Sequence, residues 1–200
     1  MRYKICVSGS AANNCTQGAF KKAWEVGYQI AKQGGVLVTG ATIGIPEWST
    51  RGAKAADGVS IGLSPAGSMR EHVRKYHLPT SNMDIIIYTG FDYSGRNLLL
   101  TRSSDAVIEI CGRIGTLNEF SIAFEDRKPV GILLGTGGAV EQIPAIIKAA
   151  HRGHKNVIYD TDPERLIKKV IRAVKLQNRG LDKKGKSRSL ARRLKNLVSD

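Results

Sequence analysis

The sequence predicts an α/β fold: a single domain on a doubly wound, mostly parallel, Rossmann-like sheet. Short apolar runs alternate along the chain with segments of helical periodicity, as strands alternate with covering helices in such folds. Strands that are apolar along their length indicate a sheet covered by helices on both faces. At 200 residues, the chain is long enough to bury one sizeable core.

The elements follow from these runs and from the residues that bound them. Ser68 and Glu71 form a Ser-x-x-Glu capping box, and Asp162 before Pro163 is an N-cap with proline at the first helical position. Gly34-Gly35 ends the first helix. Strands are expected at 3–8, 36–39, 58–62, 84–87, 106–110, 130–134 and 156–159. Helices are expected near 16–33, 48–56, 69–75, 95–103, 116–126, 140–150 and 163–175.

Glycine-bearing turns directly follow the first, second and fifth expected strands. The carboxyl ends of parallel strands share one edge of the sheet, and ligands bind at that edge near the switch in strand order. We therefore expect the three turns to converge on one site, although a plain turn would also explain the first of them. The candidate ligand contacts in the first two turns are Gly9, Ser10, Gly40 and Gly44.

The third turn leads into a helix, because Leu117, Phe120 and Phe124 recur beyond it at helical spacing. Free backbone amides and the positive end of the dipole make a helix start an anion site. We therefore expect a phosphorylated ligand there, with the Glu119 carboxylate beside it. The candidate phosphate contacts are Gly112, Arg113, Ile114, Gly115 and Thr116.

The same residues also have a purely structural interpretation. Thr116-Leu-Asn-Glu119 fits a capping box, in which the threonine caps the helix and the glutamate bonds back to its first amide. In that case Glu119 stabilises a helix end by about 0.5–2 kcal/mol and contacts no ligand. The residues alone leave both interpretations open.

The motif around this turn resembles the signature of LONELY GUY-type proteins, the lysine-decarboxylase-like branch of the SLOG superfamily. It reads Arg96, then Asp105-Ala-Val-Ile, then Gly112-x-x-Gly115-Thr116-x-x-Glu119. Arg96 falls at the family's catalytic arginine and Glu119 at its catalytic glutamate. The resemblance covers about residues 3–174 and implies a homodimer.

The resemblance further implies hydrolysis of the N-glycosidic bond of a nucleoside 5′-monophosphate, which releases a free base and ribose 5-phosphate. The sugar passes through an oxocarbenium-like state, which a nearby carboxylate stabilises. An arginine and the amides of a glycine turn would fix the 5′-phosphate and, with it, the sugar.

The chain departs from the family motif in ways that bear on activity. Asn97 stands in place of a lysine, Cys111 in place of a proline and Arg113 in place of the second glycine. An upstream glycine-rich motif is reduced to Gly40-Ala-Thr-Ile-Gly44. A side branch resembles molybdenum cofactor carrier proteins, which bind a phosphorylated pterin without hydrolysing nucleotides. A non-catalytic binding or carrier protein is therefore the alternative to a hydrolase.

Positive charge is concentrated at the C-terminus. The formal net charge is +14, and residues 177–200 carry eight Lys or Arg against two Asp, which leaves +8 on residues 1–176. We assign residues 1–176 to the nucleotide-binding domain and 177–200 to a basic tail. For a short amphipathic helix in this tail, docking on the protein is favoured over disorder and over contact with nucleic acid or a membrane surface. A basic surface suits a phosphorylated small molecule, and the tail could also contact nucleic acid non-specifically.

The remaining composition excludes several classes of site. Cys6, Cys15 and Cys111 lack Cys-x-x-Cys spacing, so we expect neither a disulfide framework nor a zinc site, with Cys111 as a small apolar filler. The four histidines form no convincing ligand set, and we expect no metal and no cofactor. No run resembles a membrane span or a signal-peptide core. We therefore expect a soluble protein of the reducing cytoplasm with no membrane partner.

Overall fold

One parallel sheet organises the molecule. A computed structural model describes residues 2–11, 15–153 and 156–179 of the chain. The strands in these residues are β1 (Lys4–Gly9), β2 (Val36–Thr39), β3 (Ser60–Ser64), β4 (Ile85–Tyr88), β5 (Ala106–Ile110), β6 (Val130–Leu133) and β7 (Val157–Asp160). They form a single sheet in the order β4-β3-β2-β1-β5-β6-β7, and every neighbouring pair is parallel. The strand order reverses between β1 and β5, which are neighbours.

The predicted α/β fold and its strands are confirmed, each strand within two residues of its expected position. The largest difference is in β3, which begins at Ser60 rather than at 58. The preceding helix is still ending there: the amide of Gly58 donates to the carbonyl of Ala53 at 2.9 Å, and Asp57 adopts a φ of 52°. The chain therefore becomes extended only after Gly58.

Helices connect the strands. They are α1 (Ala19–Lys32), α2 (Ile45–Ala55), α3 (Met69–Arg74), α4 (Asp92–Ser103), α5 (Ile114–Glu125), the 3-10 helix η1 (Gly138–Gln142) and α6 (Ile143–Ala149). A further helix covers residues 163–179. It runs past the predicted end at 175; the amphipathic helix predicted in the tail lies at 180–200, outside the described residues.

Three helices, α2, α4 and α5, begin two or three residues earlier than predicted, and α2 and α5 follow glycine turns at the ligand-binding edge. Gly44, with a φ of 78°, turns the chain directly into α2, which has proline in its first turn. Cys111 and Gly112, with φ angles of 58° and 81°, turn the chain so that α5 starts at Ile114. The first residues of α2 and α5 therefore belong to the glycine turns or directly follow them.

The interpretation of Thr116 and Glu119 as a capping box, one of the two that the sequence leaves open, is therefore wrong. The N-cap of α5 is Arg113, which makes no side-chain capping hydrogen bond, and Thr116 already lies inside the helix. The other two predicted caps are confirmed. The hydroxyl of Ser68 accepts from the Glu71 amide at 3.2 Å, and Asp162 Oδ1 accepts from the Arg165 amide at 2.8 Å.

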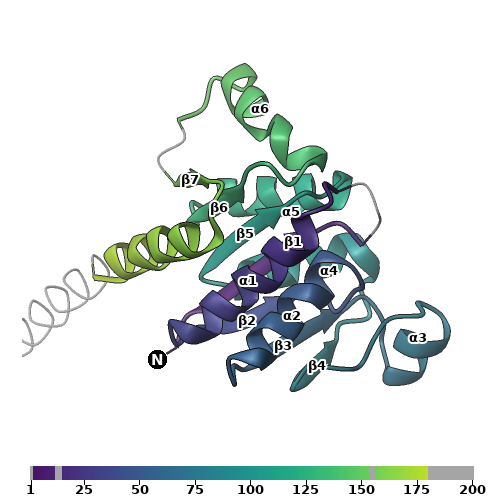
Figure 1. Ribbon diagram of the computed structural model, residues 1–200. Helices are drawn as coiled ribbons and strands as arrows, with labels where there is room; N and C mark the ends of the chain where they lie inside the picture. The colour runs from purple at the N-terminus through teal and green to yellow at the C-terminus, as the bar shows by residue number, and fades with distance from the viewer. Residues whose placement is uncertain (1, 12–14, 154–155, 180–200) are drawn as a thin grey trace, which may run out of the picture.

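Helices cover both faces of the sheet (Figure 1). On one face Ile5, Val7 and Ile108 pack against α1, α2 and the helix at 163–179. On the other face Cys6 and Val107 pack against α4, α5 and α6. Because side chains alternate along a strand, Ser8 on β1 and Glu109 on β5 also point toward the α4 and α5 face.

Two glycines let α1 and α2 approach until their backbones touch. A Cβ at Gly27 would overlap the Ser49 carbonyl of α2, and a Cβ at Gly52 would overlap the Trp24 carbonyl of α1. Side chains larger than hydrogen would separate the helices. This close packing fixes the position of α2, and with it the turn between β2 and α2.

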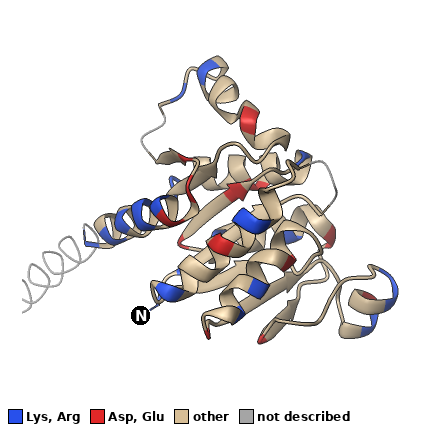
Figure 2. Cartoon of the chain, in the orientation of Figure 1, with Lys and Arg blue, Asp and Glu red and all other residues tan. Residues whose placement is uncertain are grey.

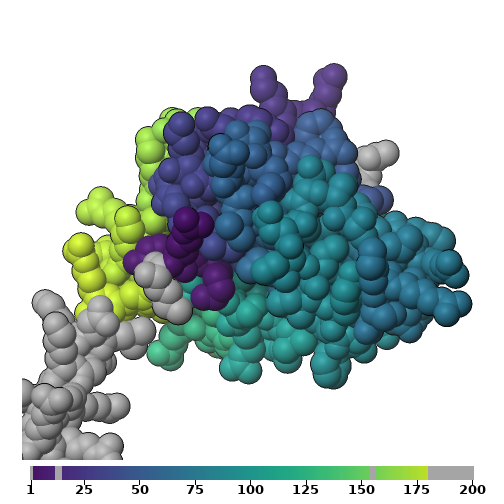
Figure 3. Space-filling model, turned by 90° about the horizontal axis from the view of Figure 1, so that it is seen from below, coloured from purple at the N-terminus to yellow at the C-terminus, as the bar shows by residue number. Residues whose placement is uncertain are grey.

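Charge is spread unevenly over the surface. The helix at 163–179 is rich in lysine and arginine along its exposed side, and acidic residues are scattered over the remaining elements (Figure 2). That helix lies at one end of the molecule beside the N-terminal residues, with the segment around α3 at the other end (Figure 3). Among the described residues no helix has the length and apolar character needed to cross a membrane.

Candidate functional site

A pocket of about 600 Å³ opens at the carboxyl edge of the sheet, where the strand order reverses. The turns after β1, β2 and β5 all contribute to its wall, as the sequence predicts. Tyr76, His77 and Leu78, which follow α3, close its far side. Of the candidate ligand contacts, those that line the pocket are Gly9, Ser10, Gly40, Arg96, Arg113, Gly115, Thr116 and Glu119.

The other three candidate residues shape the turns and do not form the lining. Gly44 has a φ of 78°, and a Cβ there would overlap the Ser10 carbonyl. Gly112 has a φ of 81°, and a Cβ there would overlap Thr116. The side chain of Ile114 is 79% exposed and points to solvent, so only its backbone can serve the site.

Arg96 is buried between α4 and the sheet. Its Nη1 donates to the Leu63 carbonyl at 3.4 Å, and its guanidinium lies 5.9 Å from the centre of the Tyr93 ring. Burial lowers the pKa of Arg96, and the nearby Glu119 carboxylate opposes that shift. Gly40 makes room for the side chain, because a Cβ at position 40 would overlap the guanidinium. Sequence analysis identifies both residues as site candidates, but the contact between them comes from the fold.

Glu119 is also buried, on the second turn of α5. The hydroxyl of Ser8 donates to its Oε2. With the Asn97 amide oriented so that its NH2 group faces acceptors, Asn97 donates to Glu119 Oε1 and to the Tyr93 carbonyl, both at 2.9 Å. Burial raises the pKa of Glu119, while Arg96 and the Ser8 hydrogen bond act in the opposite direction. Glu119 thus connects α5 to β1 and α4 rather than to its own helix end.

The start of α5 forms one wall of the pocket. Arg113, Gly115 and Thr116 line the cavity, and the first hydrogen bond of the helix runs from the Leu117 amide to the Arg113 carbonyl. The amides of residues 114–116 come before that first bond and have no acceptor within the helix. Together with the positive end of the helix dipole, these N–H groups favour an anion at this wall. The guanidinium of Arg113 adds a cation at the same place.

Aromatic side chains lie on another wall. Tyr76 and Tyr93 both line the pocket, and their ring centres lie 5.8 Å apart in an edge-to-face arrangement. The Tyr76 hydroxyl donates to Asp92, which fixes its ring. These tyrosines are not among the residues predicted from the sequence; the available signal is the spacing of Tyr93 and Arg96, one helical turn apart on α4.

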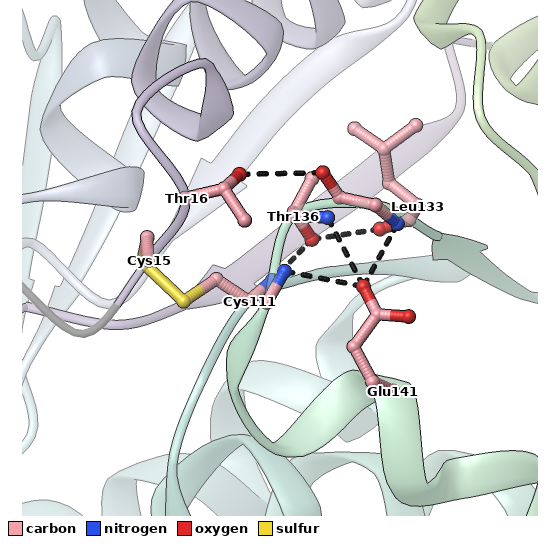
Figure 4. The surroundings of a disulfide bond; sticks show 8 residues. Cys15, Thr16, Cys111, Leu133, Thr136 and Glu141 are labelled. Atoms are coloured by element: carbon pink, nitrogen blue, oxygen red, sulfur yellow. Dashed lines mark hydrogen bonds between the residues drawn. A yellow bond between two sulfur atoms is a disulfide. The ribbon is translucent and has the colours of Figure 1, made fainter.

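A disulfide joins the turns on either side of the strand switch (Figure 4). Cys15, between β1 and α1, is bonded to Cys111, which follows β5, with their Cα atoms 5.5 Å apart. The predictions that the chain has no disulfide and that Cys111 is an apolar filler are therefore wrong. Ninety-six positions separate the two cysteines, and they meet only because β1 and β5 are adjacent. The bond also removes the cysteine-based argument for a reducing compartment.

The loop after β6 supports both halves of this disulfide. The Thr16 amide donates to the Thr136 carbonyl at 3.0 Å, and the Cys111 amide donates to Thr136 Oγ1 at 2.9 Å. Glu141 Oε1 accepts from the amides of residues 135–137 at 2.8–3.1 Å, which fixes that loop (Figure 4). The disulfide therefore lies in a dense hydrogen-bond network behind the pocket.

Comparison with known proteins identifies the family. Residues 2–167 match the SLOG cluster4 family. The chain belongs to this family. The resemblance to the SLOG superfamily that the sequence motif indicates is thereby confirmed. Over 122 residues the chain is 34% identical to an uncharacterized protein of Archaeoglobus fulgidus, covering 61% of this chain and 75% of that one.

Two solved structures are similar to this chain over most of its length. The molybdenum cofactor binding protein of the phototrophic bacterium Rippkaea orientalis is 31% identical, with a TM-score of 0.70, covering 86% of this chain and 98% of that one. The molybdenum cofactor carrier protein of Chlamydomonas reinhardtii is 26% identical, also with a TM-score of 0.70 and coverage of 86% and 98%.

Gly40→Ala is expected to displace Arg96 from its buried position, because the added methyl group would overlap the guanidinium. Forcing an extra carbon into a packed site costs about 1–3 kcal/mol, so the free energy of unfolding should fall by that amount. Chemical denaturation measures it. Gly18→Ala, whose Cβ would meet nothing within 4 Å, is the control. Equal losses in both variants would contradict the assigned role of Gly40.

Proposed function

We propose that the protein binds a phosphorylated nucleotide or nucleotide-like cofactor in this pocket, with the phosphate at the start of α5. The observation that carries the proposal is the wall formed by Arg113, Gly115 and Thr116 at the point where the strand order reverses. Helix-start amides and an arginine are the groups that proteins use for phosphate. The Arg96 guanidinium, deeper in the same pocket, adds a second positive charge.

The rest of the pocket suits a planar ring. Tyr76 and Tyr93 offer aromatic surface within the same pocket, and about 600 Å³ lies within the range of small-molecule sites. The structural relatives from Rippkaea and Chlamydomonas are a molybdenum cofactor binding protein and a molybdenum cofactor carrier protein, which favours a pterin-type ligand as much as a nucleobase.

A second candidate function is hydrolysis of the N-glycosidic bond of a nucleoside 5′-monophosphate. It is favoured by the presence of Arg96 and Glu119 in one buried pocket, at the motif positions of the predicted catalytic pair. A carboxylate there could stabilise an oxocarbenium-like sugar or activate water. Burial raises the pKa of Glu119 toward neutral pH, which suits a general acid or base.

A ligand panel tests both functions with one preparation. Isothermal titration calorimetry would compare nucleoside 5′-monophosphates, the matching nucleosides and a phosphorylated pterin, while chromatography measures released base. We expect the phosphorylated compounds to bind and the nucleosides to bind far more weakly. Equal binding with and without phosphate would contradict the proposal, and binding without base release would favour the carrier function over the hydrolase.

We also propose a homodimer that buries an apolar surface of β4 and α4. Ile85 and Ile87 are 52% and 48% exposed and pair in register with Ile61 and Leu63, which face α4 and α5. Leu98 on α4 is 43% exposed on this side of the sheet. Exposed apolar side chains gathered on one face of a protein are typical of an interaction site.

Leu98→Asp is expected to convert the dimer to a monomer, because a charge would be buried at the interface. Sedimentation velocity measures the change. Leu176→Asp, at an exposed leucine of the helix at 163–179, provides the control and should leave the dimer intact. A wild-type protein that sediments as a monomer at micromolar concentration would refute the dimer proposal.

A further inference from the structure

A second buried carboxyl group lies behind the pocket, and the proposed function does not use it. Glu109 is the next-to-last residue of β5 and is 0% exposed. Neither of its carboxyl oxygens has a hydrogen-bond partner among the described residues. An ionised carboxylate in such a position pays its full desolvation cost without compensation, and buried groups of this kind become neutral instead.

Glu109 and Glu119 are linked through Ser8. In the pairing of β1 with β5, Ser8 lies opposite Glu109, and both side chains point toward the α4 and α5 face. The Ser8 hydroxyl donates to Glu119 Oε2. Burial raises the pKa of Glu109 well above its usual value, and the charge of Glu119 adds to that effect, while the Ser8 hydroxyl opposes it.

The other groups around Glu109 supply no compensating charge. On β1, Cys6 is a buried free thiol whose pKa is raised by burial and by both glutamates. On β6, the residue in register with Glu109 is Ile132. Arg96 of α4 interacts with Glu119 rather than with Glu109.

The two carboxyl groups therefore differ in what stabilises their charge. Glu119 has hydrogen-bond donors on both oxygens and a neighbouring guanidinium, all of which favour its ionised form. Glu109 has neither. Two adjacent buried carboxyls do not both ionise readily, so a single proton should remain on the less stabilised one.

We propose that Glu109 is a protonated, uncharged positioning residue, which leaves the single negative charge of a buried carboxyl pair on Glu119 at the pocket floor. The Ser8 hydroxyl has one hydrogen and can donate to one carboxylate at a time. While Glu109 is neutral, that hydrogen stays with Glu119. When Glu109 ionises at high pH, it competes for the Ser8 hydrogen and places a second negative charge beneath the pocket.

The effect on ligands rests on the proposed function, since it assumes that a phosphate binds above this pair. A second negative charge would repel the phosphate, so affinity should fall at alkaline pH. Glu109→Gln keeps the side-chain shape and cannot ionise, so the variant should lose this alkaline decline. Removing Glu109 thus changes the pH profile rather than abolishing binding.

Infrared spectroscopy of the ligand-free protein tests the protonation state directly. Wild type at pH 7 should show the carbonyl band of a protonated carboxylic acid, which shifts on ¹³C labelling of glutamate and is absent from Glu109→Gln. Glu125→Gln, at a surface glutamate of α5, should retain the band, and so should Cys6→Ala. A wild-type protein without the band at pH 7 would overturn the proposal whether or not any variant folds.

The pH dependence of thermal unfolding gives a second readout. A carboxyl whose pKa is raised in the folded state contributes stability that is fully present below its unfolded pKa of about 4.3. That stability is lost as the pH rises through the folded pKa. The Tm of wild type should therefore fall relative to that of Glu109→Gln between pH 5 and pH 9. A constant Tm difference would contradict a protonated Glu109.

Binding of inorganic phosphate, measured by calorimetry from pH 6 to pH 9, completes the test. As the pH rises, the affinity of wild type for phosphate should fall by about tenfold for each unit by which bound phosphate raises the pKa of the Glu109–Glu119 pair. The affinity of Glu109→Gln should fall less. Parallel profiles would overturn the link between Glu109 and the pocket. If wild type binds no phosphate but shows the infrared band, the proposed function fails while the protonated Glu109 stands.

Discussion

Removing the disulfide by the double substitution Cys15→Ser and Cys111→Ser is expected to lower the free energy of unfolding by about 4–5 kcal/mol. The bond closes a loop of 96 positions, and a cross-link of that span restricts the unfolded chain strongly. Hydrogen bonds through Thr16 and Thr136 remain in the variant, so the fold itself should survive. Chemical denaturation with and without reductant measures the loss.

The reductant provides an internal control. Wild type should become as unstable as the double variant when reduced, and the variant should not respond, because its remaining cysteine, Cys6, is a buried free thiol. The pocket should also respond, since Ala11 and Arg113 line it from the two loops that the bond connects. Identical stability of oxidised and reduced wild type would show that the disulfide contributes nothing.

Glu119→Gln is expected to lower any base-releasing turnover by about 10²–10⁴-fold, the usual contribution of a positioned acid or base. Glutamine keeps the size of the side chain and can still accept from Ser8, so the fold and ligand binding should persist. Turnover of the nucleotide panel by both proteins is the measurement. Glu125→Gln, on the exposed side of the same helix, is the matched control.

Comparable turnover by wild type and Glu119→Gln would exclude Glu119 as a catalytic group. An absence of turnover by wild type, together with tight binding of a phosphorylated ligand, would instead support the carrier function. Either result leaves the phosphate wall of α5 as a separate question, because that wall is formed by Arg113, Gly115 and Thr116 rather than by Glu119.

The sequence predicts the sheet well because its strands are short, apolar and bounded by glycine turns or caps. The strand Ala106–Ile110 and the Ser68 and Asp162 caps depend on neighbouring residues, and local patterns identify them. The convergence of the glycine turns also follows from general rules, since the carboxyl ends of parallel strands share an edge.

Long-range contacts are what the sequence leaves undetermined. The local pattern Thr116–Glu119 suggests a capping box, but Glu119 bonds to Ser8, 111 positions away. The same holds for the disulfide, because no pattern near Cys15 or Cys111 in the sequence indicates that the two residues bond to each other. A glutamate within an otherwise apolar strand was an available signal for Glu109, and only the fold reveals that it lies beside the pocket.

The central claim is that a phosphate binds at the start of α5, and a crystal structure with a bound nucleoside 5′-monophosphate tests it most directly. The account predicts phosphate oxygens within hydrogen-bond distance of the backbone amides of residues 114–116, near Arg113, with the base toward Tyr76 and Tyr93. A structure with the phosphate at another surface, and with the turn at 112–116 facing only solvent or core, would contradict it.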